Sequence, residues 1–400
     1  MSEGKTDVVV IGYARTPVGK FGGGLSSLSA MQLGGHAIRG ALDGAGIDPD
    51  AVGYTVMGHV LQAGLGQITS RQAAVEGGIS MSIAAETINK VCLSGMTAIS
   101  RARDLVRLGE FGVVVAGGME SMSNAPFLLD KARFGYRMGN GELIDVMMHD
   151  GLTCAFDNCA MGLATDQYQL DKPQLASISR ERQDEWSARS HERAATAWKE
   201  GSFQGEVVPV SVPQRKGDPV LVEEDEGIRP GTTGESLGTL RPAFTKDGTI
   251  TAGNASQISD GGAALILTTA DQAKQLGAEP LATIRSWGTV AGPDASLHLQ
   301  PAEAIRNAAA RIGADPAGFD LYEINEAFAS VAIASTDDLG LDEDKVNVNG
   351  GGVALGHPIG CTGARIVVSL INELHRRGGG SGAAALCGGG GQGDALIVEV

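Results

Sequence analysis

The 400-residue sequence lacks an apolar run close to the roughly 20 residues that a membrane-spanning helix needs. Its first seven residues also lack the pattern of a signal or transit peptide, and they run directly into the strand-like residues 8–11. We therefore expect a cytoplasmic protein that has no membrane partner.

The chain has fewer positively charged than negatively charged residues. Lysine and arginine number 31 against 47 aspartates and glutamates, which gives a formal net charge of −16. A protein that binds nucleic acid needs a basic face for the phosphates, so this balance argues against a nucleic-acid partner. An anionic small molecule needs only a local basic rim and remains a possible ligand.

The five cysteines form no disulfide framework, since their number is odd and their spacing irregular. We expect reduced thiols in a reducing compartment. Cys154 and Cys159 are close in sequence, but no second cysteine pair or histidine pair accompanies them. A zinc site is therefore not expected.

The chain is nevertheless long enough for two or three domains, and its 42% apolar and 20% charged residues are typical of a globular protein. Strand-like and helix-like segments alternate up to about residue 120 and again from residue 253, which predicts an α/β fold with a mostly parallel sheet. The intervening residues are richer in loops and read as an inserted domain. The alternating segments of the first part are residues 8–11, 31–44, 52–60, 70–76, 94–108 and 113–116, and a polar helix is expected at 177–199.

The two ends of the chain resemble each other. Residues 92–95 precede a helix and a strand that ends at Gly117, and residues 360–363 precede a helix (364–377) and a strand that ends at Gly388. The two spacings differ by three residues, which favours a duplicated fold whose halves share one cleft. Residues 388–393 formally match a dinucleotide-binding glycine motif, but a strand-like segment follows where a helix is required, so we reject that site.

Cys92 directly precedes the helical segment 94–108. A thiol at the N-terminus of a helix feels the positive end of the helix dipole, which favours the reactive thiolate. Cys92 is therefore the first candidate for a nucleophile. Cys154, Cys159 and Cys361 lack such a setting and read as small apolar core residues.

Three further positions stand out. Cys387 ends a strand and opens a four-glycine loop, whose N–H groups could form an oxyanion hole. His357 lies in a glycine-rich loop before Pro358, where the alternative is a solvent-facing side chain. Asn325 and Glu326 follow a strand, and they read either as a helix N-cap pair or as an amide and a carboxylate fixed at a ligand-binding strand end. His59 is ambiguous.

Taken together, residues 89–95, 325–329, 356–363 and 387–390 resemble the motifs of the thiolase family, and the resemblance extends over nearly the whole chain. It implies a duplicated, five-layered αβαβα fold with an inserted loop domain, and a homotetramer or homodimer. The N-terminal half would comprise residues 1–121 and 252–274, the inserted domain 122–251 and the C-terminal half 275–400. The supporting motifs are residues 14–17, 62–64, 117–122, 241–244 and 254–256.

The resemblance also implies roles. Cys92 would take the acyl group from an acyl-CoA, and His357 would activate it and, with a water held by Asn325, stabilise an enolate oxygen. Cys387 would move the C2 proton of acetyl-CoA, and the N–H groups of Cys92 and Gly389 would form a second oxyanion hole. Phe328 would wall the acyl pocket, with no permanently bound cofactor or metal. The positions matching the coenzyme A site are Leu152, Arg229, Ser236, Phe244, Ala252 and Ser256.

The implied activity interconverts two acetyl-CoA with acetoacetyl-CoA and CoA. The alternative is a broader-range 3-ketoacyl-CoA thiolase of fatty acid β-oxidation. A decarboxylating condensing enzyme would not need Cys387 or the Asn325 motif, and a carrier without turnover should have lost Cys92, His357 or Cys387.

Three departures from the family pattern bear on specificity. Ala160 stands where a histidine is common, Cys361 and Thr362 replace the usual small pair, and residues 291–301 differ from the form typical of biosynthetic short-chain enzymes. These differences leave the chain-length preference open.

Overall fold

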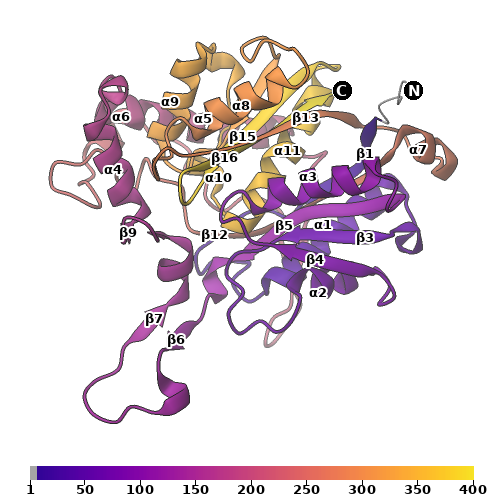
Figure 1. The fold of residues 1–400 in the computed structure, drawn as a ribbon, viewed down its shortest axis with the longest axis horizontal. Helices are drawn as coiled ribbons and strands as arrows, with labels where there is room; N and C mark the ends of the chain where they lie inside the picture. Colours follow the sequence, from indigo (N-terminus) through magenta and orange to yellow (C-terminus); the bar gives the residue numbers. More distant parts are fainter. Residues whose placement is uncertain (1–6) are drawn as a thin grey trace.

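The computed structural model describes residues 7–400 of the chain. The first six residues lie outside the described part. They belong to the N-terminal segment in which we expected no targeting peptide. The two ends of the predicted duplication form two α/β halves that share a 10-stranded hydrogen-bonded sheet in the order β14-β15-β16-β13-β1-β12-β5-β3-β4, with β2 beside β12 (Figure 1). Its strands are β1 (Val8–Arg15), β2 (Gly19–Lys20), β3 (Tyr54–Gly58), β4 (Ala84–Ile88), β5 (Val113–Ser121), β12 (Ser259–Thr269), β13 (Ala282–Ala291), β14 (Leu321–Ile324), β15 (Ser381–Gly388) and β16 (Gln392–Glu399).

The prediction of a mostly parallel sheet is wrong. Parallel pairing is confined to β3 with β4, β3 with β5, and β14 with β15, and the other ladders are antiparallel. β15 and β16 are joined by a tight glycine turn, which can only connect antiparallel strands. β12 enters between β1 and β5 after the long insertion and runs against both. A pattern of alternating segments does not reveal this reversal.

The strands bury apolar side chains on both faces, and this creates the layers. Val114 faces a central core with the helices α3 (Ser94–Arg107) and α11 (Ile359–Arg376), while Val115 faces an outer core with α1 (Ala30–Ala45) and α2 (Thr69–Glu76). In the other half, Leu396 faces the same central helices and Ile397 faces α8 (Gln300–Ala310) and α9 (Ala329–Leu339). The result is the expected five-layered αβαβα arrangement.

The two central helices approach each other at glycines. A Cβ atom on Gly95 would lie 2.8 Å from the backbone nitrogen of Ala364, and one on Gly363 would lie 2.5 Å from that of Met96. These are the glycines of the predicted repeat, so the two copies of the motif cross each other. The close crossing brings the segment around Cys92 beside the loop that carries His357. α11 begins at Ile359, five residues before the predicted start at residue 364, since Gly360 and Gly363 look like turn residues but serve helix contact.

The segment between the halves contains long helices as well as loops. Its α5 begins three residues after the start of the predicted helix 177–199 and ends one residue after its end, and a hairpin of β6 and β7 projects away from the body (Figure 1). The remaining elements are β6 (Phe127–Leu129), β7 (Leu143–Asp145), β8 (Thr153–Cys154), β9 (Cys159–Ala160), α4 (Met161–Asp171), α5 (Arg180–Glu200), β10 (Val210–Val212), β11 (Val220–Val222), α6 (Gly234–Gly238), α7 (Ala270–Leu276), α10 (Gly352–Leu355) and short helical turns at Pro49–Ala51, Met122–Asn124, Ala132–Phe134, Met147–Gly151, Pro173–Leu175 and Glu343–Lys345.

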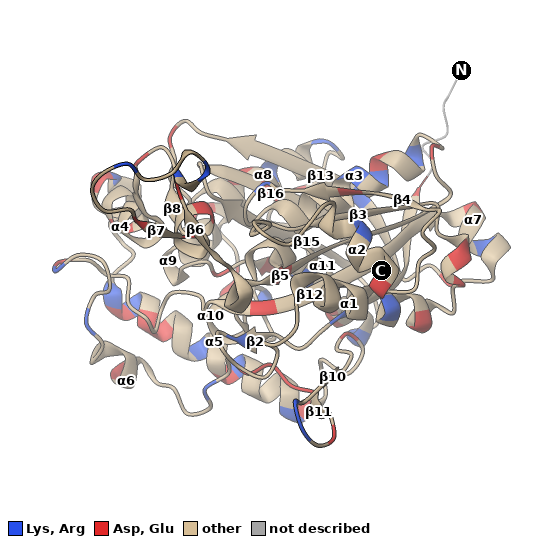
Figure 2. Cartoon of the chain, turned by 90° about the horizontal axis from the view of Figure 1, so that it is seen from below, with Lys and Arg blue, Asp and Glu red and all other residues tan. Residues whose placement is uncertain are grey.

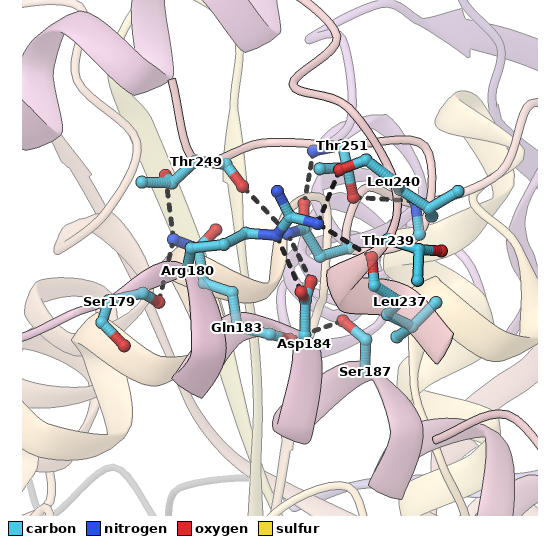
Figure 3. A network of polar contacts seen from close by, with 12 residues as sticks. Ser179, Arg180, Gln183, Asp184, Ser187, Leu237, Thr239, Leu240, Thr249 and Thr251 are labelled. Atoms are coloured by element: carbon cyan, nitrogen blue, oxygen red, sulfur yellow. Dashed lines mark hydrogen bonds and ion pairs between the residues drawn. The ribbon is translucent and has the colours of Figure 1, made fainter. Parts of the chain in front are cut away.

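Polar contacts fasten this segment to its neighbours. Arg180 donates to Asp184 at 2.7 Å and to the carbonyl oxygens of Leu237 and Leu240 at 2.8 and 2.9 Å (Figure 3). Asp184 also accepts a hydrogen bond from Asn254 at 3.0 Å. The start of α5 thereby holds the loop that leads to Ser256.

Charged residues lie mainly on helices and loops, while the central strands are almost free of them (Figure 2). Among residues 7–400, no helix is long and apolar enough to cross a membrane, and no group of three or more histidine, cysteine, aspartate or glutamate side chains is arranged to hold a metal ion. All five cysteines are unpaired, consistent with the expected reduced thiols.

Candidate active site

A cavity of about 320 Å³ lies where the two halves meet the inserted segment, and it is lined by Cys92, His357 and Cys387 together with Gly389. The remaining wall is largely apolar. It consists of Val91, Met148, Gly151, Leu152, Ala160, Met161, Gly162, Phe244, Ala255, Ser256, Ile258, Leu297, Ala327, Phe328, Ile359 and Gly388. Three of the residues singled out from sequence for acyl chemistry therefore share one site, although almost 300 positions separate the first from the last.

The nucleophile candidate sits on a strained turn. Val91 adopts a positive φ of 50°, which a β-branched residue rarely does. Ser94 Oγ donates to the Val91 carbonyl at 2.6 Å and accepts from the Lys90 N–H at 2.8 Å, while Asn89 Oδ1 accepts from the Val91 N–H at 3.1 Å. The polar residues of this motif thus hold the turn that presents Cys92 to the cavity.

The expectation that helix α3 favours a thiolate at Cys92 is wrong for the free protein. Burial raises the pKa of the Cys92 thiol from 9.0 to about 11, and the N–H groups of Cys92 and Gly389 offset only part of that rise. Such a shift corresponds to about 3 kcal/mol, whereas a helix terminus contributes about 0.3–1 kcal/mol. Desolvation in the apolar cavity outweighs the helix dipole, so Cys92 needs a base.

His357 lines the same cavity and is the candidate for that base. Burial, aided by the charge of Arg365, lowers the pKa of His357 to about 3, so its imidazole is neutral near pH 7. The hydroxyl of Thr362 lies 3.0 Å from the Pro358 carbonyl and 2.6 Å from His357 Nδ1. When the hydroxyl donates to the carbonyl, its oxygen accepts from the Nδ1–H of His357, and this arrangement places the ring proton on Nδ1. Nε2 has no hydrogen-bond partner among residues 7–400, and its lone pair is free to accept a proton.

Cys387 is fully buried at the end of β15 and packs against Leu297, Met161 and Phe328. Burial raises the pKa of its thiol, and the proximity of Cys92 adds to the rise. In the resting protein Cys387 is therefore a thiol, which is the form needed to donate a proton.

Asn325 and Glu326 follow β14, but they do not cap α9, whose N-cap residue is Phe328. Asn325 is buried without lining the cavity, and in the described part of the chain neither its Oδ1 nor its Nδ2 has a hydrogen-bond partner. Glu326 has the opposite environment, because its carboxylate accepts from Trp186, Ser190 and Asn347 at 2.7–2.9 Å. Glu326 fixes the loop, while Asn325 keeps a buried amide whose hydrogen-bonding capacity a bound water would satisfy.

The residues expected to bind coenzyme A fall into two groups. Leu152, Phe244 and Ser256 line the cavity, as does Phe328, which was expected to wall the acyl pocket. Arg229, Ser236 and Ala252 do not line it, and all three are exposed. Hydrogen bonds from Ser256 N–H to the Ala327 carbonyl at 3.0 Å and from Ala329 N–H to the Asn254 carbonyl at 2.9 Å join the Ser256 loop to the Phe328 loop.

The sequence departures have distinct structural outcomes. Ala160 lines the cavity, whereas Cys361 is buried outside it, and burial raises the pKa of its thiol to about 12. Leu297 brings the unusual segment 291–301 into the cavity wall.

Several contributors were missed from sequence. They include Met148, Met161, Leu297 and Ile359 in the wall and Thr362 behind His357. Isolated apolar residues carry no local signal of a cavity. Thr362, five residues after His357 at the start of a helix, could have been found from its spacing.

His59, ambiguous in the sequence, is a structural residue. It is buried, its Nδ1 lies 2.9 Å from Thr69 Oγ1, and its Nε2 lies 3.2 Å from Glu120 Oε1. Glu120 also accepts from the N–H groups of Val60 and Gly360 at 3.1 and 2.9 Å. This carboxylate therefore ties the start of α11 to the N-terminal half.

Known proteins resemble the chain along its entire length. The thiolase N-terminal domain matches residues 8–271 and the thiolase C-terminal domain matches residues 278–400. A probable acetyl-CoA acetyltransferase of Mycolicibacterium smegmatis is 54% identical over 98% of this chain and 100% of its own length. An acetyl-CoA acetyltransferase of Cupriavidus necator is 46% identical over 98% and 99% of the two chains. The crystal structure of the Bacillus anthracis acetyl-CoA acetyltransferase superposes with a TM-score of 0.95 at 40% identity and covers 100% of both chains. The chain belongs to the thiolase family.

Proposed function

We propose that this protein is an acyltransferase that interconverts two acetyl-CoA with acetoacetyl-CoA and CoA through an acyl group on Cys92. Relatives named acetyl-CoA acetyltransferase over nearly the full chain support the activity. The observation that carries the chemistry is the convergence of Cys92, Cys387 and a neutral His357 on one largely apolar cavity.

In the first step, His357 Nε2 accepts the Cys92 proton and the sulfur attacks the thioester carbonyl. The N–H groups of Cys92 and Gly389 stabilise the oxyanion, and their approach to the Cys92 sulfur supports this role. CoA leaves as a thiol after taking the proton of Cys387, which becomes a thiolate, while the Cys92 proton stays on His357 Nε2. One thioester replaces another, so the step is reversible.

In the second step, Cys387 removes the C2 proton of a second acetyl-CoA while His357 and a water on Asn325 stabilise the enolate oxygen. Each such donor is worth about 3–4 kcal/mol of the barrier. The enolate carbon attacks the acyl-Cys92 carbonyl, which forms acetoacetyl-CoA and releases the Cys92 thiolate, and this thiolate takes its proton back from His357. Thiolysis is the reverse path. Unpartnered polar atoms on His357 and Asn325, within residues 7–400, support these roles.

We expect the cavity to take a short acyl group, because the bulky side chains of Leu297, Met161 and Phe328 pack against Cys387 and line the cavity beside it. Leu152, Phe244 and Ser256 line the cavity, whereas Arg229, Ser236 and Ala252 are exposed outside it. We assign the three lining residues to the pantetheine arm of CoA and the three exposed residues to its nucleotide end, with CoA and acyl-CoA as substrates and no bound cofactor.

We also propose a homotetramer or homodimer. The β6–β7 hairpin projects from the body and exposes Phe134 by 91% and Met138 by 95%, which supports contact with another copy (Figure 1). The proposed parts are residues 1–121 with 252–274, residues 122–251, and residues 275–400. Five unpaired cysteines support a reducing, cytoplasmic location, and the substrates suggest a role in lipid and fatty acid metabolism.

The test is CoA-dependent cleavage of acetoacetyl-CoA by the purified protein, run beside a medium-chain 3-ketoacyl-CoA. We expect cleavage of the short substrate and at least tenfold slower cleavage of the longer one. Cys92→Ala should be inactive, whereas Cys159→Ala, which removes a partly buried thiol outside the cavity, should keep full activity. Equal cleavage of both substrates would contradict the short-chain assignment, and cleavage of neither would contradict the activity.

A further inference from the structure

A second hollow of about 360 Å³ lies at the other end of helix α3, and four arginines line it. α3 has 14 residues and a rise of about 1.5 Å per residue, so its two ends are about 20 Å apart. Cys92 precedes the first end, while Arg103 and Arg107 occupy the last two turns. The hollow is thus separate from the acyl-transfer cavity. It is lined by Asp7, Val8, Arg103, Asp104, Arg107, Ile284, Arg285, Ser286, Trp287, Arg311 and Ile312.

This gathering of positive charge runs against the composition of the protein. The chain has a net charge of −16, yet the lining of the hollow holds four arginines and two aspartates. Asp104 is paired with Arg103 at 3.1 Å, and Arg285 lies 3.3 Å from Glu399. For Arg107 and Arg311 no ion pair is found within residues 7–400. The hollow therefore keeps an excess of positive charge.

Arg103 is the anchor of the cluster. Its side chain is only 12% exposed, and its Nε is buried without a hydrogen-bond partner in the described part of the chain. Burial lowers the pKa of Arg103, Asp104 opposes this change, and the charges of Arg107 and Arg311 add to it. A nearly buried guanidinium beside two like charges is costly unless an anion offsets it.

The backbone also shapes the hollow. The pairing of β13 with β16 shifts register between Ile284 and Ser286, so Arg285 is the extra residue of a β-bulge. Bulges redirect a side chain from its regular place in a strand. Ser286 is held separately, since its Oγ donates to the Ala308 carbonyl at 2.8 Å.

We propose that this hollow is a binding site for a small anion that carries at least two phosphate groups. Guanidinium groups bind phosphate oxygens through paired N–H donors, and four of them suit a ligand with two phosphates. Arg311 already covers the face of Trp287, with 4.4 Å between its Cζ and the ring centroid. A guanidinium group therefore already covers one face of the indole, and the site recognises charge rather than an aromatic base.

The experiment uses inorganic pyrophosphate as the probe and isothermal titration calorimetry on the full-length protein. We expect saturable binding at one site per chain that weakens at least about tenfold in Arg103→Gln. Arg107→Gln, a change at an exposed position that spares folding, should weaken binding as well. Arg215→Gln removes the same charge from an exposed loop outside the hollow and should bind pyrophosphate like the unmodified protein.

Absence of saturable binding would overturn the proposal, and so would equal weakening in Arg215→Gln and Arg107→Gln, which would indicate general charge attraction. Binding that saturating CoA abolishes would place the pyrophosphate in the acyl-CoA site instead. Titration in the presence of CoA separates this outcome from a failure of the proposed acyltransferase activity, because the calorimetric signal needs no turnover.

Discussion

Replacing Thr362 by valine removes one hydroxyl and leaves the shape of the side chain almost unchanged. That hydroxyl accepts the hydrogen bond from His357 Nδ1 at 2.6 Å, and its own proton goes to the Pro358 carbonyl at 3.0 Å. In Thr362→Val the buried Nδ1–H loses the one acceptor that residues 7–400 offer it. The tautomer that keeps Nε2 free for the Cys92 proton is then no longer favoured.

The expected loss follows from the cost of an unsatisfied buried group, about 1–3 kcal/mol. At about 1.4 kcal/mol per factor of ten, the rate of acetoacetyl-CoA cleavage should fall roughly 10- to 100-fold. Thr362 does not line the cavity, so the KM for CoA should change little while kcat falls. Alkylation of Cys92 by iodoacetamide at pH 7 should slow in parallel, since the same base serves both reactions.

Two variants make the result interpretable. Thr362→Ser keeps the hydroxyl and should retain most of the activity. Thr268→Val makes the same chemical change at a buried threonine that donates to the Gly112 carbonyl at 2.7 Å, far from the cavity. The reasoning is refuted if Thr362→Val cleaves substrate and reacts with iodoacetamide as fast as the unmodified protein. It also fails if Thr362→Ser or Thr268→Val loses as much activity.

Further outcomes follow from other parts of the structure. Cys387→Ala should still form acetyl-Cys92, detectable by mass spectrometry, but lose condensation by at least about a hundredfold; equal loss of both steps would contradict the assigned roles. Burial lowers the pKa of His298 from 6.5 to about 4, so the folded state favours its neutral form, and stability is present above pH 6.5 and lost as the pH falls toward 4. At pH 5 the neutral preference of this histidine should lower the free energy of unfolding by about 2 kcal/mol. The drop in urea midpoint between pH 7 and pH 5 should therefore be smaller in His298→Leu than in the unmodified protein. An equal drop in both proteins would refute this role of His298. Phe134→Asp with Met138→Asp should reduce the oligomeric state seen by light scattering, and an unchanged mass would exclude the hairpin from assembly.

The alternation of segments predicted the elements well, since it depends on local apolar periodicity. α3 begins at Ser94 and α1 spans Ala30–Ala45, close to the predicted 94–108 and 31–44. Strand direction was not predictable in the same way. β12 enters the first half after an insertion of more than a hundred residues, and only long-range pairing decides that it runs antiparallel to β1 and β5.

The catalytic candidates were readable from sequence, because short motifs fix a turn, a loop or a strand end at Cys92, His357 and Cys387. Their protonation was not. The helix next to Cys92 indicated a thiolate, but the cavity wall that desolvates the sulfur comes from Leu297, Phe328 and other residues distant in the chain. Desolvation depends on all the residues that fold around the sulfur, and its effect on the pKa of Cys92 exceeds that of the α3 helix dipole.

By itself, the sequence determined the family motifs, the duplicated α/β plan and the candidate residues for acyl chemistry. Tertiary structure decided which of them meet, since the crossing at Gly95 and Gly363 joins the two halves. It also decided that His357 Nε2 has no hydrogen-bond partner in the described part of the chain, that Leu297 and Phe328 pack against Cys387, and that four arginines meet in the hollow at the far end of α3. Motifs act over a few neighbouring residues, whereas burial, tautomer and charge clustering depend on atoms that only the folded chain brings together.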